Sequence, residues 1–292
     1  MKKLAVINDL SGIGRSSLSI QLPVVSALSV TCCPVPTAIL SSHTAYKDVA
    51  ATGFKDHLGD FFDAWKKNGF IFDGILIGYL GDTEEHPMIS DFIKDQKARN
   101  PGVIVILDPV MADNGNLYRN MTEKHIEAML SLAKQADLMT PNLTEAALLT
   151  DFDYEGIRET LEECKHDAAK GMVFNSLLSA LHHITPGAVI VTGIEEENEA
   201  GQKQLLNVLS ETDGDLRFIR NPRTGNGRPG TGDLFSAIIS AKLLNGTDPW
   251  KACRSAADFV GLAIKHSEEL NLPVIEGVQF EDLLRHLSDS DC

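Results

Sequence analysis

The sequence has little of what secreted or nucleic-acid-binding proteins require. Its five cysteines form no C-x-x-C pair, and an odd number cannot close a disulfide framework. The first apolar run, Leu4 to Ile7, is too short for a signal peptide. Lys and Arg total 26 against 41 Asp and Glu, a formal net charge of -15, whereas binding nucleic acid requires a basic surface. We therefore expect a cytoplasmic protein with no nucleic-acid partner.

Charge is also missing between Arg15 and Lys47, a stretch long enough to raise the question of a membrane span. Pro23, Pro34 and Pro36 interrupt it, together with many Ser and Thr residues. This composition favours a buried helix followed by a buried strand. We expect no membrane span.

Short apolar runs alternate with helical patterns along the chain. The runs predict strands at 4–8, 30–40, 73–81, 103–110, 136–142 and 188–194. The helical patterns cover 56–69, 84–100, 122–135 and 154–183. The strands are apolar throughout, as expected when helices cover both faces of a parallel sheet. We predict one α/β domain over residues 1–292, with a mostly parallel central sheet and helices on both faces.

Several of these strands end in small polar residues. The endings are Asn8-Asp9, Gly78-Tyr79, Asp108-Pro109, Thr140 to Asn142, and Thr192-Gly193. For each one alone, the residues are explained by strand termination. Ligands of open α/β sheets, however, bind beyond the carboxyl ends of the strands. Five such endings together favour a shared binding crevice.

Two common nucleotide-binding motifs are absent. The stretch "SGIGRSS" begins like a dinucleotide fingerprint, but Ser17 stands where the third glycine belongs. No Asp or Glu occurs between Leu10 and Lys47, so the acid that binds a ribose hydroxyl is missing. No glycine is followed by lysine, which excludes the G-x-x-x-x-G-K-[ST] phosphate loop. A nucleotide would have to bind through a different element.

The stretch "RPGTGDLFSAIISAKLL" places a glycine-rich turn and Asp233 in front of an apolar helix. Two glycines separated by one residue let backbone amides point outward, and the helix start adds positive potential. Such an anion hole can hold phosphate oxygens, and Asp233 can accept the proton of an attacking alcohol. The alternative is that Asp233 is only the helix N-cap, worth about 0.5–2 kcal/mol.

"GTGDLFSAIISAKLL" resembles the catalytic signature of the ribokinase-like superfamily, which sugar, adenosine and hydroxymethylpyrimidine kinases share. Five further stretches narrow the resemblance to the pyridoxal (pyridoxine, pyridoxamine) kinases: "INDLSGIGRSSL", "LSSHTAY", "GYLGD", "DPVMADNGNLY" and "TPNLTEAALL". They follow the expected order over nearly the whole chain. The resemblance implies ATP-dependent phosphorylation of the 5'-hydroxymethyl group of these vitamers, and a homodimer.

The resemblance also implies a role for individual residues. Asp233 would be the base, with an anion hole formed by Gly230, Thr231 and Gly232. Contacts to the pyridine ring would come from Asp9, Thr44 and Tyr79. ATP would be contacted by Asp113, Asn142 and Thr192. Metal ions would be held by Asp108, Asp113, Thr140 and Glu145. Mg²⁺ would lie near Asp113 and, through its shell, Glu145, and a monovalent cation, K⁺ or Na⁺, near Asp108, Thr140 and Glu145.

Physical chemistry supports a role for cations, because an acidic chain accepts the charge of ATP only with hard cations held by oxygen ligands. Simpler alternatives stay open: Asp108 as a turn residue, Glu145 as a first-turn acid and Tyr79 as core. We expect His43 to make a structural hydrogen bond. We also expect a solvated loop to carry Arg220, Arg223 and Arg228.

The sequence departs from the family pattern at two places. Asp9 stands where some relatives have serine, and Ala112 and Asp113 follow Met111 where some have a cysteine that traps the aldehyde. We therefore expect no thiol chemistry with the aldehyde. Two rival functions remain: a hydroxymethylpyrimidine or other small-alcohol kinase, and a non-catalytic vitamer-binding sensor that kept the fold.

Overall fold

The computed structural model describes residues 1–164, 166–198, 200–212 and 214–289; Cys292 lies outside them. The chain forms two compact units. The first contains Met1–Asp108 and Thr224–Cys292, and the second contains Pro109–Arg223. The single domain predicted over residues 1–292 stays a prediction.

The described part of the first unit contains a sheet with the strand order β5-β4-β1-β2-β3. Its strands are β1 (Lys3–Ser11), β2 (Thr31–Leu40), β3 (Ala51–Gly53), β4 (Gly74–Ile77) and β5 (Ile104–Leu107). The pairs β1–β2, β1–β4 and β4–β5 are parallel, and β3 runs antiparallel to β2. Residues 4–7 and 75–77 are fully buried, as expected for parallel strands covered on both faces.

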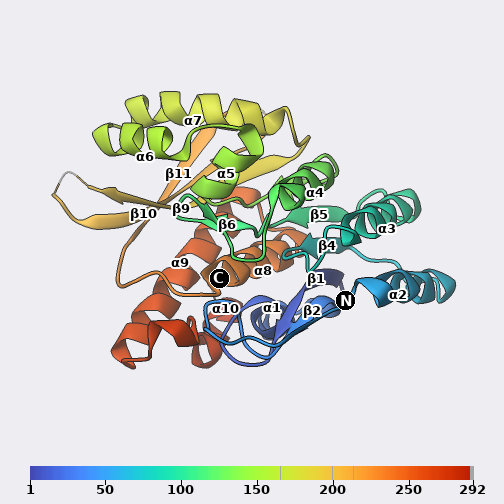
Figure 1. Ribbon diagram of the computed structural model, residues 1–292. Helices are drawn as coiled ribbons and strands as arrows, with labels where there is room; N and C mark the ends of the chain where they lie inside the picture. The colour runs from blue at the N-terminus through green and yellow to red at the C-terminus, as the bar shows by residue number, and fades with distance from the viewer. Residues whose placement is uncertain (165, 199, 213, 290–292) are drawn as a thin grey trace. The chain divides into compact units, whose positions relative to one another are not determined.

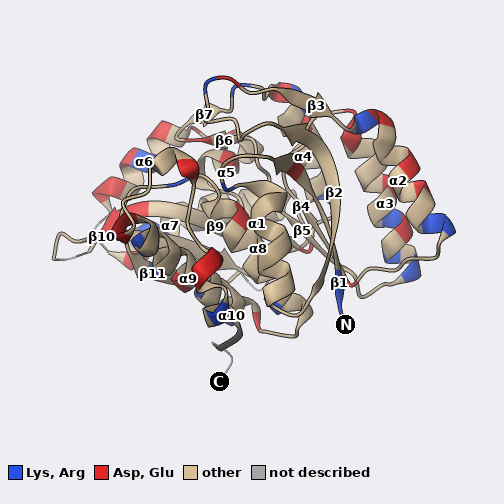
Figure 2. Ribbon diagram, turned by 90° about the horizontal axis from the view of Figure 1, so that it is seen from below, with Lys and Arg blue, Asp and Glu red and all other residues tan. Residues whose placement is uncertain are grey.

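Helices cover both faces of this sheet. The helices of the first unit are α1 (Ser17–Ala27), α2 (Lys55–Lys67), α3 (Glu85–Arg99), α8 (Thr231–Leu244) and α9 (Pro249–Glu269). α1 packs on β1, β2 and α8, while α2 packs on β2 and α3. In Figure 2, β1 and β2 lie between the α1/α8 pair and the α2/α3 pair, and α1 carries no charged residue. The predicted buried helix followed by a buried strand is confirmed as α1 and β2.

After α9 the chain continues through two 3₁₀ turns, η1 (Val274–Glu276) and η2 (Glu281–Leu283), and the short helix α10 (Arg285–Asp289). This segment is tied to the loop after β1, because the Arg15 N–H donates to the Glu276 carbonyl at 3.2 Å. The Arg15 guanidinium also pairs with Glu281 at 2.8 Å.

In the described part of the second unit the strand order is β11-β10-β9-β8. These strands are β8 (Leu138–Met139), β9 (Ala188–Glu197), β10 (Lys203–Ser210) and β11 (Leu216–Pro222). β8 and β9 are parallel, whereas β9, β10 and β11 form an antiparallel meander. A separate small hairpin joins β6 (Ala112–Asp113) to β7 (Asn116–Leu117). β10 and β11 were not predicted from the sequence.

The helices of the second unit are α4 (Glu123–Ala133), α5 (Leu143–Thr150), α6 (Tyr154–Glu163) and α7 (Asp167–His182). Figure 1 shows α6 and α7 lying over the meander, and α7 packs on β9. The helical pattern predicted at 154–183 therefore forms two helices; residue 165, between them, lies outside the described residues. Within the described ranges, no helix is both long and apolar enough to cross a bilayer.

Candidate active site

The glycine-rich turn before α8 has the geometry that its sequence predicts. Gly230 is the N-cap of α8 with φ +86°, a conformation that L side chains disfavour. A Cβ atom there would lie 2.4 Å from the Arg15 carbonyl oxygen and from Cδ1 of Ile20. Only glycine fits, and α8 begins at Thr231, where the first N–H groups of a helix have no partner within the helix.

Asp233 lies in the first turn of α8 and is not the N-cap, so the alternative of a simple capping role is wrong. Its Oδ1 accepts a hydrogen bond from Nδ2 of Asn8 at 3.2 Å, and the Ser17 backbone N–H also donates to the carboxylate. Burial is the main cause that raises the pKa of Asp233 to about 7, and the nearby carboxylates of Asp108 and Asp9 contribute to the rise. A carboxylate with this pKa is poised to take a proton near neutral pH.

Asp9 lies in β1, directly after Asn8, and is buried. Its Oδ2 accepts from Oγ of Ser11 at 2.9 Å, and its Oδ1 accepts from Oγ of Ser17. Burial raises the pKa of Asp9, and these two hydroxyl bonds oppose the rise. Both carboxylate oxygens already have internal donors, so a contact to the pyridine ring would use their remaining lone pairs.

The other two predicted ring contacts lie in loops of the same unit. Tyr79 is half-buried after β4, and its backbone is held by Asn8 Oδ1 and by the Thr37 hydroxyl. Thr44 is exposed in the loop after β2. The adjacent His43 is buried, and its Nε2 lies 2.7 Å from the Ile275 carbonyl oxygen. The structural hydrogen bond expected of His43 is confirmed.

In the second unit, Asn142 and Glu145 form a capping box at the start of α5. Asn142 Oδ1 accepts from the Glu145 N–H, and Glu145 Oε2 accepts from the Asn142 N–H, each at 2.9 Å. Glu145 Oε1 accepts from the Met111 N–H at 3.1 Å, while Asn142 Nδ2 donates to the Ala112 carbonyl at 2.8 Å. Glu145 thus has a structural role, and its predicted metal role stays a prediction.

The other predicted phosphate and metal residues of this unit surround the capping box. Thr192 pairs with Asn142 in an isolated parallel bridge, and its N–H donates to the Pro141 carbonyl at 2.9 Å. Asp113 is exposed in the β6–β7 hairpin. Thr140 Oγ1 is buried and has no hydrogen-bond partner among the described residues.

These oxygen groups fit hard cations in type. An unpartnered buried hydroxyl such as that of Thr140 is a candidate ligand for a cation, and Mg²⁺ in nucleotide sites needs only one or two carboxylates beside the phosphates. In the part of the chain that the structure describes, no three His, Cys, Asp or Glu side chains form a metal-binding group.

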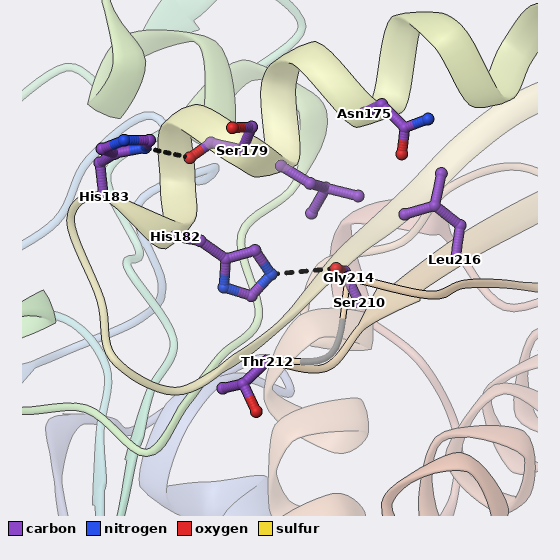
Figure 3. A pocket seen from close by; sticks show the side chains of 9 residues that line it. Asn175, Ser179, His182, His183, Ser210, Thr212, Gly214 and Leu216 are labelled. Atoms are coloured by element: carbon purple, nitrogen blue, oxygen red, sulfur yellow. Dashed lines mark hydrogen bonds between the residues drawn. The ribbon is translucent and has the colours of Figure 1, made fainter.

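A cavity of about 500 Å³ lies elsewhere in the second unit, between α7 and the end of β10 (Figure 3). It is lined by Asn175, Leu178, Ser179, His182, His183, Ser210, Thr212, Gly214 and Leu216. Its histidines are already paired: His182 Nε2 with the Ser210 hydroxyl at 2.9 Å, and His183 Nδ1 with the Ser179 carbonyl at 2.6 Å. None of the predicted site residues lines it.

The arginine interpretation was wrong for Arg228, which is 5% exposed. Its guanidinium donates to Glu268 at 2.9 Å and to the carbonyls of Leu272 and Pro273. The expectation was also wrong for Arg220, which lies in strand β11 and pairs with Glu196 at 2.6 Å. Arg223 follows that strand and pairs with Glu195 at 2.8 Å. These side chains hold elements together within their own units.

Asn8 was not predicted as a site residue, although the polar ending of β1 was recognised from the sequence. A buried amide at the end of an otherwise apolar strand was the available signal. Ser17 was noted only as the residue that breaks a dinucleotide motif. Its φ of +51° and its bonds to Asp9 and Asp233 were not visible in the sequence.

The parallel sheet with helices on both faces, and the glycine turn that opens α8, define an enzyme with the ribokinase-like fold. The family model for phosphomethylpyrimidine kinase matches residues 19–276. The chain belongs to the phosphomethylpyrimidine kinase family.

Individual relatives agree with this assignment. A solved Bacteroides thetaiotaomicron structure, assigned as a phosphomethylpyrimidine kinase, is 32% identical with a TM-score of 0.87, covering 98% of this chain and 94% of that one. A second crystal form of that protein contains pyridoxal. The pyridoxal kinase of Lactobacillus plantarum is 27% identical with a TM-score of 0.86, over 100% and 98% of the two chains.

A curated relative, the pyridoxine/pyridoxal/pyridoxamine kinase of Bordetella avium, is 30% identical over 192 residues. The match covers 65% of this chain and 59% of that protein.

Proposed function

We propose that this chain is an ATP-dependent kinase that phosphorylates the 5'-hydroxymethyl group of pyridoxal, pyridoxine or pyridoxamine, a salvage route to pyridoxal 5'-phosphate. The observation that carries the proposal is a carboxylate with a pKa of about 7, Asp233, next to the glycine turn of α8. The names of the relatives support the substrate class, and so does the pyridoxal in the Bacteroides crystal.

In the proposed reaction, Asp233 accepts the proton of the vitamer hydroxyl as its oxygen attacks the γ-phosphorus of ATP. The bond from the γ-phosphorus to the bridging oxygen breaks, and ADP leaves with the electron pair. The N–H groups of Gly230, Thr231 and Gly232 stabilise the charge on the transferred phosphoryl oxygens. Asp9, Thr44 and Tyr79 are proposed to hold the pyridine ring.

A kinase that uses ATP requires a divalent metal to neutralise the phosphates. We propose Mg²⁺, held by Asp113 and through Glu145, and a monovalent cation, K⁺ or Na⁺, held by Asp108, Thr140 and Glu145. The unpartnered hydroxyl of Thr140 supports this assignment. Asn142 and Thr192 are proposed to lie along the phosphates of ATP.

We also propose a single kinase domain, a homodimer and a cytoplasmic location. Three exposed apolar side chains of the first unit support the dimer: Leu10, Ile13 and Ile39. The free thiols among the described cysteines fit a reducing compartment. Sedimentation equilibrium tests the dimer.

A second candidate is a hydroxymethylpyrimidine kinase, which the matching family model favours. Both candidates use the same base and anion hole, so only the substrate separates them. The experiment is ADP release from ATP and Mg²⁺ with pyridoxal, pyridoxine, pyridoxamine, hydroxymethylpyrimidine or ribose. Turnover restricted to the vitamers supports the proposal, and turnover restricted to hydroxymethylpyrimidine refutes it. Vitamer binding without ADP release indicates a sensor. If the chain is a kinase, excess EDTA removes the divalent metal and abolishes turnover.

A further inference from the structure

Asn8 lies in β1 with 1% of its surface exposed, and its amide makes four hydrogen bonds. Oδ1 accepts from the backbone N–H groups of Asp9 and Tyr79, each at 3.0 Å. Nδ2 donates to Oε1 of Gln21 at 3.1 Å and to Oδ1 of Asp233 at 3.2 Å. One side chain thus connects the proposed base with the backbone of two proposed ring contacts.

The surrounding groups fix the orientation of this amide. Because Oδ1 accepts from two N–H groups, a flipped amide would place its own N–H₂ against them and lose both bonds. Nδ2 must therefore face Gln21 and Asp233. Gly78 leaves room for the amide, since a Cβ atom at Gly78 would lie 2.5 Å from Asn8 Nδ2.

The Asp233 carboxylate also accepts a hydrogen bond from the Ser17 backbone N–H. Ser17 has φ +51°, and its hydroxyl donates to Asp9. Asp233 is thereby held by donors from two separate segments of the chain, β1 and the start of α1. Rotation of the carboxylate would break one or both of these bonds.

We propose that Asn8 is a positioning residue for phosphoryl transfer: its amide holds the Asp233 carboxylate and the Tyr79 backbone in one fixed relation. The proposal rests on the proposed function for the identity of the reaction. Asn8 touches neither the alcohol nor the phosphate, and it acts through Asp233. A displacement of about 1 Å in a reacting group is enough to cost about 10²-fold in rate.

The decisive variant is Asn8→Asp, which has nearly the same shape. Its Oδ1 keeps the acceptor bonds to Asp9 and Tyr79, but an oxygen replaces the donor that faces Asp233. The two buried carboxylates then repel each other or share one proton, and in both cases Asp233 loses the donor that holds its ionised form. We expect kcat for the vitamer to fall by about 10–100-fold while KM stays within about twofold, because the Tyr79 backbone keeps its partner.

The matched control is Asn68→Asp, which adds the same charge at an exposed position. Asn68 lies at the end of α2, where its Nδ2 donates to the Ala64 carbonyl at 2.8 Å. We expect wild-type kcat and KM from this control. A second variant, Asn8→Ala, removes all four bonds, and we expect both a lower kcat and a higher KM from it.

Two results overturn the proposal: an Asn8→Asp enzyme with the kcat of the wild type, or one whose loss appears entirely in KM. If Asn8→Asp does not fold, Asn8→Ala takes its place. A lower kcat with unchanged KM in Asn8→Ala contradicts the proposed role of Asn8 in holding the Tyr79 backbone.

A crystal structure of the Asn8→Ala protein, in which residue 8 can neither donate to Asp233 nor share a proton with it, separates this proposal from the proposed function, because it requires no turnover. An Asp233 side chain in its original place refutes the positioning role even when the wild type phosphorylates the vitamers. A displaced Asp233 supports it even when the wild type acts on another alcohol.

Discussion

Replacement of Asp233 by asparagine is the sharpest test of the proposed chemistry. The substitution keeps the size of the side chain and one acceptor oxygen for the donors Asn8 Nδ2 and Ser17 N–H. It removes the group that takes the proton. General-base catalysis contributes about 10²–10⁴-fold in rate, so kcat should fall by that factor, equivalent to about 2.7–5.5 kcal/mol of activation free energy.

The same variant should not be less stable. The folded-state pKa of Asp233, about 7, lies above its ordinary value of 3.8, so the folded protein favours the protonated form. The stability that this group contributes is complete below its ordinary pKa and is lost as the pH rises through about 7. Asparagine carries no charge and avoids that loss. We expect the melting temperature of Asp233→Asn at pH 8 to equal or exceed that of the wild type.

The assay combines ADP release, measured from pH 5.5 to 9, with differential scanning calorimetry at pH 5.5 and 8. For the wild type, kcat/KM should rise with pH through about 7 as Asp233 becomes ionised in the free enzyme. An Asp233→Asn enzyme that turns over at the wild-type rate excludes Asp233 as the general base. Loss of activity only together with the folded structure excludes it as well.

Three further predictions concern the surroundings of the site. Gly230→Ala should lower the free energy of unfolding by about 2–4 kcal/mol, because it strains the left-handed backbone and overpacks its surroundings. Gly246 has φ +85° but open space around it, so Gly246→Ala should lose only the backbone contribution; urea unfolding compares the two variants. Arg228→Met should lower the free energy of unfolding by about 2–3 kcal/mol, because it removes buried hydrogen bonds made by a charged group. The more exposed Arg254→Met should lower it by no more than about 0.5 kcal/mol; equal losses would contradict this. Burial raises the pKa of Glu85 to about 7, so the stability it contributes at low pH should be lost as the pH rises through about 7, and Glu85→Gln should flatten that dependence in urea titrations at pH 5 and 8.

The strands that the sequence predicted best are those with apolar residues on both faces. β1, β4 and β5 are of this kind. In a parallel sheet covered by helices both faces of a strand are buried, so the strand appears in the sequence as a continuous apolar run. β11 was missed because its sequence, Leu216–Pro222, mixes arginine and asparagine with apolar residues. Its partners are set by the antiparallel meander, which local patterns do not encode.

The glycine turn before α8 could be predicted because it is local: its residues are consecutive, and φ at Gly230 follows from glycine alone. The bond from Asn8 to Asp233 could not, because it joins residues 225 positions apart. Arg228 shows the same limit. Its partner Glu268 lies 40 residues later, and only the folded chain shows that this arginine is buried.

The first unit is assembled from two separate segments of the chain, since residues 1–108 and 224–292 flank the second unit in the sequence. During synthesis, β4 and β5 leave the ribosome long before α8, the helix that packs on them. Their apolar face then has no permanent cover until residue 244 has emerged, which makes it a surface for chaperones. Residues 109–223, by contrast, form an uninterrupted segment that can fold while the ribosome is still working.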